Sequence, residues 1–271
     1  MVNLSAQSTL VVEGASRFDV RRANRLMDAS LCAWLSRIQY FEEIDSTNQE
    51  LLRRTDSIHG RVCVADKQTH GRGRMGREWQ GAQSPNIALS IGWQSSVELG
   101  SALSLVVGVA VAETLGAFGV TNVGLKWPND ILVDQQKLGG ILIEAVNQGD
   151  SRRYVIGVGI NLQLSESESE RIDQAWTDLK RLGVTVDRTD LVGRLVDSVA
   201  TAITLYSEEK MEPFRDKWHA LHVFDGKWVK FVHGDETGKG KVLGVNDDGV
   251  LLMQVGDQQR SFVAGEIKMA F

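Results

Sequence analysis

Short apolar runs separated by polar turn residues are the clearest pattern in the chain, and they predict strands. The runs lie at residues 39–44, 61–67, 86–93, 123–127, 131–133, 138–146 and 154–162. Residues 86–93 alternate apolar and polar positions, which is the period of a half-buried strand. The last four runs are separated by turn residues, which favours antiparallel pairing.

Longer segments with apolar residues at helical spacing predict helices. Residues 98–118 are mostly apolar and indicate a buried helix, and residues 166–182 and 211–221 are expected to be helical too. In residues 190–207 the apolar side chains fall on one helical face, at Leu191, Leu195, Val199 and Ile203. Residues 21–35 could form one more helix.

A helix start is also expected at residue 46. Ser46 can act as the N-cap, and Gln49 stands at the third helical position, so the two form a capping box. Strands and helices in this order predict an α+β fold with a mixed or antiparallel sheet.

The pattern changes near residue 222. Residues 224–271 are short β segments punctuated by Gly and Asp turns, which indicates a small SH3-like β-barrel. The expected organisation is an N-terminal extension or connector at residues 1–37, a main domain at residues 38–222 and the β domain at residues 223–271.

Composition narrows the class of protein. The 271 residues are 42% hydrophobic and 24% charged, as in an ordinary globular protein, and the net charge is −5. That net negative charge disfavours binding to nucleic acid or an anionic membrane through the overall charge of the protein. No uncharged apolar run reaches the ~18 residues that span a bilayer, and no signal peptide is evident. Two cysteines, Cys32 and Cys63, are too few for a disulfide framework, so a reducing cytoplasm is expected.

A Gly/Arg segment carries the strongest local signal for chemistry. Its glycines let the backbone approach a ligand, and its arginines offer forks that suit phosphate or carboxylate. A solvated mobile loop and an RNA-binding patch of the RGG kind remain alternatives. The segment is neither a Walker A loop nor a dinucleotide fingerprint. It reads His70-Gly71-Arg72-Gly73-Arg74-Met75-Gly76-Arg77, after Gln68.

A second signal is the turn Lys126-Trp127-Pro128-Asn129-Asp130. It can be an ordinary turn between strands, but adjacent Asn and Asp side chains can also offer oxygens to Mg²⁺. Lys137 follows at a strand start beside Gly139 and Gly140, and is a candidate counter-charge for an anionic ligand.

Taken together, these segments resemble the biotin protein ligases, the biotin–[acetyl-CoA-carboxylase] ligases of bacteria. The resemblance runs from about residue 26 to the end of the chain. Lipoate ligases share the core fold but not the pair formed by the Gly/Arg segment and the Trp-Pro-Asn-Asp turn. The motifs are Asp45-Ser46-Thr47-Asn48, the Gly/Arg segment, Lys126-Trp127-Pro128-Asn129-Asp130, Lys137-Leu138-Gly139-Gly140-Ile141 and Gly157-Val158-Gly159-Ile160-Asn161.

The resemblance implies a catalytic core like that of class II aminoacyl-tRNA synthetases, and a two-step reaction. Such enzymes join biotin to ATP, release pyrophosphate, hold biotinyl-5′-adenylate and pass biotin to a lysine of the biotin carboxyl carrier protein. ATP and Mg²⁺ are the implied co-substrate and metal, biotin is the substrate, and no tightly bound prosthetic group is expected. Opposing a carboxylate to a triphosphate requires cations in the site.

The resemblance also implies roles for individual residues. Lys137 and Arg74 are expected to be catalytic, and Asp130 is expected to hold Mg²⁺. The implied biotin-binding residues are Ser46, Thr47, Asn48, Gln68, Arg72, Gly73, Arg74, Lys137 and Gly140. The implied ATP-binding residues are Arg77, Asn86, Lys126, Asn129, Asn161 and Trp176. Trp176 packing on the expected helix 166–182 is the alternative reading of that residue.

Departures from the commoner family pattern are small: His70, Met75 and Glu78 replace residues frequent there and are expected to retune the loop. His219 and His222 lie three residues apart with no third ligand nearby, so surface or packing roles are expected rather than a metal site.

Three other functions are compatible with parts of the sequence. Lipoate or octanoate ligation is the enzymatic alternative, and a non-catalytic biotin-binding module is another. A biotin-responsive transcriptional regulator is disfavoured, because about 45 residues before Ser46 leave no room for the winged helix of larger members. No specific DNA and no membrane are expected as partners. A homodimer through the sheet edge near residues 138–144 and 154–162 is an arrangement that the family often uses.

Overall fold

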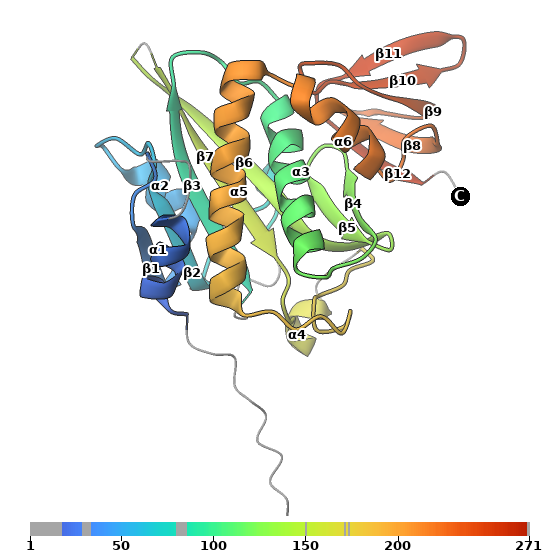
Figure 1. Ribbon diagram of the computed structural model, residues 1–271. Helices are drawn as coiled ribbons and strands as arrows, with labels where there is room; N and C mark the ends of the chain where they lie inside the picture. The colour runs from blue at the N-terminus through green and yellow to red at the C-terminus, as the bar shows by residue number, and fades with distance from the viewer. Residues whose placement is uncertain are drawn as a thin grey trace, which may run out of the picture.

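A seven-stranded sheet forms the centre of the computed structural model, which describes residues 18–28, 34–79, 86–149, 151–170, 172 and 174–269 (Figure 1). Its strands run in the order β1-β2-β3-β7-β6-β5-β4, and only β1 and β2 are parallel. The mixed, mainly antiparallel sheet is confirmed. The strands are β1 Ile38–Ile44, β2 Val62–Gln68, β3 Ile87–Ser95, β4 Val123–Lys126, β5 Asp130–Val133, β6 Gln136–Gln148 and β7 Ser151–Ile160.

The helices divide between the two faces of this sheet. Alternate side chains of β3 show the division: Leu89 and Ile91 join the core beneath the long helices, whereas Ser90 contacts α2 on the other face. In Figure 1 the helices α1, α3 and α5 lie together across one face. The helices are α1 Val20–Asp28, α2 Thr47–Arg53, α3 Ala102–Ala117, α4 Glu166–Ser169, α5 Arg188–Glu209 and α6 Arg215–Leu221, with 3₁₀ turns at Arg74–Gly76 and Glu212–Phe214.

Two helix starts follow local chemistry. The Ser46 hydroxyl accepts a hydrogen bond from the backbone N–H of Gln49, which confirms Ser46 as the N-cap of α2. Asp187 caps α5 through the N–H groups of Thr189 and Asp190. The predicted apolar face of α5 is confirmed, because Leu191, Leu195, Val199 and Ile203 are all fully buried.

The helix predicted at residues 166–182 is wrong beyond its first turn. The helix α4 ends at Ser169; further along, Trp176 forms a bridge with Lys137, and residues 179–183 form a turn. There the Lys137 N–H donates to Ala175 O, the Thr177 N–H donates to Lys137 O, and the Leu179 N–H donates to Asn161 O. These hydrogen bonds to strand ends satisfy the backbone groups that a helix would have satisfied internally.

Other boundaries differ less. The helix predicted from residue 98 begins at Ala102, because Gly100 adopts a left-handed conformation (φ 67°) just before it. The helix expected at residues 21–35 ends at Asp28 as α1, and residues 29–33, including Cys32, lie outside the described residues. Residues 80–85, which follow the Gly/Arg segment, also lie outside them.

A second sheet of five antiparallel strands follows α6, in the part of the chain where the sequence predicted a small SH3-like β domain. Its order is β11-β10-β9-β8-β12, and its inner face buries Val229, Phe231, Met253 and Ile267. The strands are β8 Trp228–His233, β9 Glu236–Val245, β10 Leu251–Val255, β11 Gln258–Phe262 and β12 Glu266–Met269.

The turn between β9 and β10 fastens this sheet to the rest of the molecule. The Trp127 indole N–H donates to Gly249 O at 3.1 Å, and the Ser101 hydroxyl donates to Asp248 O at 2.6 Å. Trp127 is buried beside Lys126, so the C-terminal sheet is tied directly to the predicted site. No helix in the described part of the chain is both long and apolar enough to cross a bilayer.

Candidate active site

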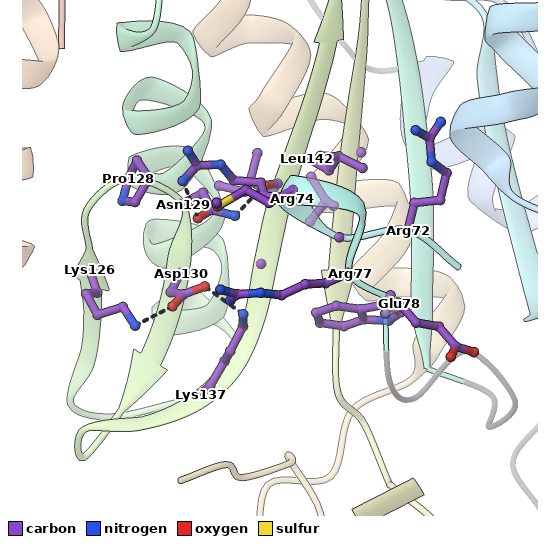
Figure 2. Close-up of a pocket in the computed structure, with 18 of the residues that line it drawn as sticks. Arg72, Arg74, Arg77, Glu78, Lys126, Pro128, Asn129, Asp130, Lys137 and Leu142 are labelled. Atoms are coloured by element: carbon purple, nitrogen blue, oxygen red, sulfur yellow. Dashed lines mark hydrogen bonds and ion pairs between the residues drawn. The ribbon is translucent and has the colours of Figure 1, made fainter. Parts of the chain in front are cut away.

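A cavity of about 470 Å³ opens on the sheet face that carries α2, opposite α3 and α5. It gathers every predicted site residue except Asn86, from six separate segments of the chain. Figure 2 shows the arginines of the Gly/Arg segment beside Lys126, Asp130 and Lys137. The predicted residues that line it are Ser46, Thr47, Asn48, Gln68, Arg72, Gly73, Arg74, Arg77, Lys126, Asn129, Asp130, Lys137, Gly140, Asn161 and Trp176.

One end of the cavity is a neutral hydrogen-bonding network. Gln68 Oε1 accepts from the Thr47 N–H at 2.9 Å and from the Thr47 hydroxyl at 3.2 Å. Ser90 Oγ lies 2.7 Å from Thr47 Oγ1 and 2.5 Å from Asn48 Oδ1. All four side chains are buried, so this end offers fixed donors and acceptors to a polar, uncharged ring.

Asn48 extends this network towards the Gly/Arg segment. Its amide nitrogen donates to Glu144 Oε2 at 2.9 Å, and Arg72 pairs with the other carboxylate oxygen at 2.8 Å. Glu144 thus holds Asn48 and Arg72 in one arrangement. The close packing of Asn48 on β7 requires a glycine, because a Cβ at Gly157 would lie 2.4 Å from Asn48 Oδ1.

The other end of the cavity is cationic. Lys126 Nζ lies 2.6 Å from Asp130 Oδ2, and Lys137 Nζ lies 2.7 Å from Asp130 Oδ1. Burial acts to raise the pKa of Asp130, but the charges of Lys137 and Lys126 outweigh it and hold that pKa below its usual value. Two ammonium groups around one carboxylate leave a net positive charge here.

The Gly/Arg loop closes over the cavity. Arg74 Nη1 donates to Asn129 Oδ1 at 3.3 Å, and burial lowers the pKa of the Arg74 guanidinium. Met75 (φ 57°) and Gly76 (φ 74°) are consecutive left-handed residues, so the loop turns sharply after Arg74. Arg77 forms an ion pair with Glu266 of β12, which joins the loop to the C-terminal sheet.

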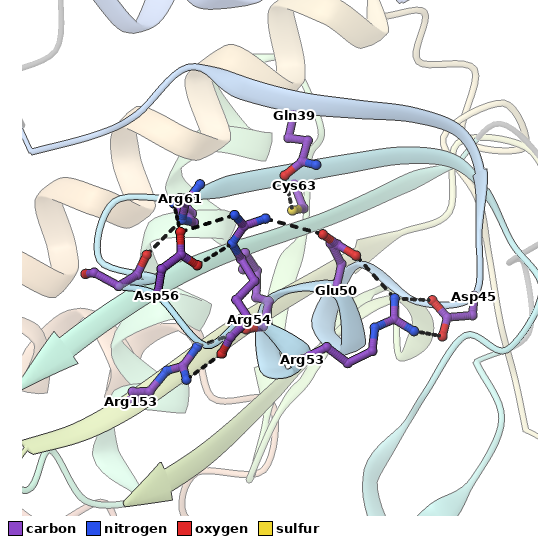
Figure 3. A network of polar contacts seen from close by, with 11 residues as sticks. Gln39, Asp45, Glu50, Arg53, Arg54, Asp56, Arg61, Cys63 and Arg153 are labelled. Atoms are coloured by element: carbon purple, nitrogen blue, oxygen red, sulfur yellow. Dashed lines mark hydrogen bonds and ion pairs between the residues drawn. The ribbon is translucent and has the colours of Figure 1, made fainter. Parts of the chain in front are cut away.

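The helix α2 is held at both ends by β7. At its C-terminal end the buried Arg153 guanidinium donates to Arg54 O at 2.8 Å and to Leu51 O at 3.2 Å (Figure 3). At its N-terminal end Asn48 rests on Gly157. Cations satisfy helix C-terminal carbonyls well, so this arrangement fixes Thr47 and Asn48 in the cavity.

The predicted nucleotide residues divide into two groups. Asn161 lines the cavity; its amide nitrogen donates to Thr177 O, while its buried Oδ1 has no hydrogen-bond partner in the described residues. Trp176 also lines the cavity and stacks with the Arg181 guanidinium at 3.9 Å. Asn86 does not line it: its Oδ1 accepts from the Leu162 and Gln163 N–H groups, which indicates a loop-holding role.

Several cavity residues were missed from the sequence. Trp79 lies over Gly159, where a Cβ would approach the indole to 2.8 Å, and its ring is 6.0 Å from Lys137 Nζ. A tryptophan ending the Gly/Arg segment was a usable signal. Glu266 and Lys268 had none, because only the tertiary fold brings β12 to the site. The buried Ser90 had none either; it does not line the cavity but supports it through Thr47 and Asn48.

The two histidines have packing roles, as expected. His222 is buried and stacks on Trp218 with ring centroids 4.3 Å apart, and His219 pairs with Asp225 at 3.2 Å. Burial lowers the pKa of His222 to about 3. Within the described residues no group of His, Cys, Asp or Glu side chains is arranged to hold a metal by itself.

Comparison with known proteins agrees with this architecture. Residues 40–161 match the model of the Biotin/lipoate A/B protein ligase family, and residues 226–269 match that of the Biotin protein ligase C terminal domain. The chain is 38% identical over 232 residues to the bifunctional ligase/repressor BirA of Salmonella typhimurium, covering 83% of this chain and 72% of that protein.

The chain belongs to the biotin protein ligase family. A second family member, the biotin–[acetyl-CoA-carboxylase] ligase of Mycobacterium tuberculosis, is 33% identical, over 82% of this chain and 85% of that protein. The solved structure of the Aquifex aeolicus biotin protein ligase with biotin and ATP superposes with a TM-score of 0.72 at 27% identity, covering 85% of this chain and 97% of that one. The predicted family and fold class are therefore confirmed.

Proposed function

We propose that this chain is an ATP-dependent biotin–[acetyl-CoA-carboxylase] ligase, the activity named for its relatives. The observation that carries the proposal is that one cavity joins a neutral hydrogen-bonding end to a cationic end. A ureido ring needs fixed donors and acceptors, and a carboxylate meeting a triphosphate needs positive charge.

In the first step a biotin carboxylate oxygen attacks the α-phosphorus of ATP. The bond from that phosphorus to the β-phosphate oxygen breaks, and pyrophosphate leaves. Lys137, Lys126 and Arg74 neutralise the charge that accumulates as the two anions meet. Thr47, Asn48 and Gln68 hold the ring, with Ser46 and Gly73 beside them, while Gly140 leaves room for the tail.

In the second step the neutral amine of a carrier lysine attacks the acyl carbon of the adenylate. The bond from that carbon to the phosphate oxygen breaks, AMP leaves and an amide forms, with one proton released from nitrogen. The mixed anhydride must be shielded from water until the amine arrives. Arg74, Arg72 and Arg77 sit on the loop that covers the cavity and supply that shielding.

The donor set fits a magnesium ion bound mainly through ATP phosphates. Mg²⁺ takes few protein ligands, usually one or two carboxylates with phosphate oxygens and water. Asp130 supplies one buried carboxylate, with the amide of Asn129 adjacent. Such an ion would neutralise phosphate charge, and Asp130 would hold it.

The nucleotide is proposed to lie towards Trp176, in the segment after α4, and Asn161, whose carbonyl is hydrogen-bonded to that segment. The free Asn161 Oδ1 suits a donor on the base or the ribose. Asn86 is left out of this proposal, because its side-chain oxygen already accepts two backbone hydrogen bonds.

The proposed macromolecular partner is the biotin carboxyl carrier protein. A homodimer can form along β6, because β5 pairs with it only as far as Gly140 and no described strand covers its remaining flank. The prediction that residues 154–162 also form a sheet edge is wrong, because β7 lies inside the sheet between β3 and β6. A cytoplasmic location and the lack of specific DNA binding stay predictions; a gel shift with a biotin-operon operator tests the latter.

A thermal-shift screen with biotin, lipoate and octanoate, each with and without MgATP, tests the substrate. We expect biotin with MgATP to give the largest shift, together with pyrophosphate release and biotin transfer to a carrier domain. Stabilisation by lipoate or octanoate with MgATP but not by biotin would overturn the assignment in favour of another acyl transfer.

A further inference from the structure

Four exposed lysines gather on the outer face of the C-terminal sheet. We call this surface the lysine face: Lys230 on β8, Lys239 and Lys241 on β9, and Lys268 on β12. Lys230 is directly opposite Lys268 across the β12–β8 pair and directly opposite Lys239 across the β8–β9 pair. Residues paired in this way point to the same side of a sheet, so three ammonium groups form a row across three strands.

This arrangement works against the stability of the sheet. Like charges directly opposite each other on neighbouring strands are destabilising. None of the four ammonium groups has an ion-pair partner within the residues that the structure describes. The acidic side chain that shares their face, Glu266, is engaged by Arg77.

Protection of a sheet edge does not explain the row. Lysines on an exposed edge strand commonly prevent that strand from pairing with another chain, and β12 is an edge strand. However, β8 and β9 lie inside this sheet with neighbours on both sides, and they carry Lys230, Lys239 and Lys241. A row through interior strands, in a chain whose net charge is −5, indicates a surface that meets a negatively charged partner.

The position of the lysine face identifies that partner. Lys268 and its neighbours from Gly265 line the cavity, so the row starts at the rim of the site and leads outward. Any protein that places a lysine into the cavity must cover this rim. Beside the row, Trp228 (48% exposed) and Val232 (46% exposed) add apolar surface of the kind found in protein interfaces.

We propose that the lysine face is the docking surface for an acidic region of the carrier protein, next to the lysine that receives biotin. The proposal rests on the proposed function and adds the surface by which the second substrate is recognised. Long-range attraction of this kind mainly raises the association rate and is screened by salt.

The double variant Lys230→Gln/Lys239→Gln tests the proposal in the full-length chain. We expect the KM for the carrier domain to rise about fivefold or more at low salt, with kcat unchanged, and the difference to shrink at 0.5 M salt. The charge-reversed variant Lys230→Glu/Lys239→Glu should raise the KM for the carrier domain further. The Gln variant should melt at or above the parent temperature, because a repulsion has been removed.

Two controls separate docking from chemistry. Lys67→Gln/Lys217→Gln removes two exposed lysines from β2 and α6, outside the C-terminal sheet, and should leave the carrier KM unchanged. Pyrophosphate release, and biotinyl hydroxamate formation with hydroxylamine as a small neutral acceptor, should be the same in all variants.

The outcomes are distinguishable. If the parent releases pyrophosphate and labels the carrier, and the lysine-face variants keep the parental carrier KM at low salt, the docking proposal is wrong while the proposed function stands. If the variants instead lose binding to a nucleic-acid probe and keep carrier recognition, the partner class is wrong. Absence of adenylation in the parent refutes the proposed function itself.

Discussion

Replacing Gly157 with alanine inserts one methyl group between β7 and Asn48, in the floor of the cavity. The new Cβ would lie 2.4 Å from Asn48 Oδ1 and 3.1 Å from Asn48 Cγ, whereas ordinary contacts begin at 3.4 Å. The Asn48 amide must therefore retreat by about 1 Å, the difference between 3.4 and 2.4 Å, or β7 must shift by a similar amount.

Either movement disturbs the neutral end of the cavity. Asn48 Oδ1 lies 2.5 Å from Ser90 Oγ, and the Asn48 amide nitrogen donates to Glu144 Oε2 at 2.9 Å. The same Glu144 carboxylate forms an ion pair with Arg72. Overpacking of this kind costs about 1–3 kcal/mol of folding stability. A misplacement of about 1 Å can cost up to about a hundredfold in reaction rate. Because the displaced Asn48 is proposed to hold biotin itself, we expect biotin affinity to fall by a similar factor, roughly ten- to a hundredfold. ATP affinity should change little, because the cationic end is untouched.

Isothermal titration with biotin, and separately with ATP, measures the two affinities, and thermal melting measures the stability. Gly116→Ala is the matched control, since a Cβ on that α3 residue meets nothing within 4 Å. The control should bind biotin normally and gain up to about 1 kcal/mol from reduced chain entropy. Parental biotin affinity in a folded Gly157→Ala protein would refute the placement of biotin against Asn48.

Three further predictions use the other parts of the molecule. Lys137→Met should lower pyrophosphate release at least about a hundredfold with little change in melting temperature, and release within a few-fold of the parent would remove Lys137 from the mechanism. Arg74→Gly should still release pyrophosphate but lose adenylate faster, labelling serum albumin on a streptavidin blot, with Arg74→Lys intermediate; equal labelling by Arg74→Gly and the parent contradicts retention by Arg74. Burial lowers the pKa of His222 to about 3, so the folded state favours the neutral ring. Its stabilising contribution is complete above the unfolded value near pH 6.5 and should be lost at about 1.4 kcal/mol per pH unit as the pH falls from there towards 3; an equally steep acid melting profile for His222→Gln would exclude this group as a cause.

Where a local pattern decides the structure, the sequence predicted the fold. The capping serine at residue 46, the apolar stripe of α5 and the turn-separated strands from residue 123 are all determined within a few residues. The helix prediction for the segment after α4 was wrong, because the backbone partners of that segment, Lys137 and Asn161, are distant in sequence and leave no periodic signal. Those long-range hydrogen bonds override the intrinsic helix propensity of residues 170–182.

The candidate site shows the same limit. Residues in recognisable motifs, such as Lys137 and Asp130, were predicted and do meet in the cavity. Ser90 and Glu266 do not belong to any motif. Strand alternation places Ser90 under Thr47 and Asn48, and the second sheet brings Glu266 to the cavity. The nucleotide role of Asn86 was implied by the resemblance alone, and its side chain instead accepts hydrogen bonds from the Leu162 and Gln163 amides.

The ion pair between Arg77 and Glu266 has a consequence for the timing of synthesis. The two residues are 189 positions apart, and the second belongs to the strand that completes the cavity wall. At about 5–20 residues per second, the ribosome adds Glu266 roughly 10–40 s after Arg77. Throughout that interval the Gly/Arg loop has no C-terminal sheet to close against. A nascent chain that has already folded its seven-stranded sheet therefore cannot yet shelter a reactive anhydride, and ligation must wait until β12 has been made and has folded against the loop.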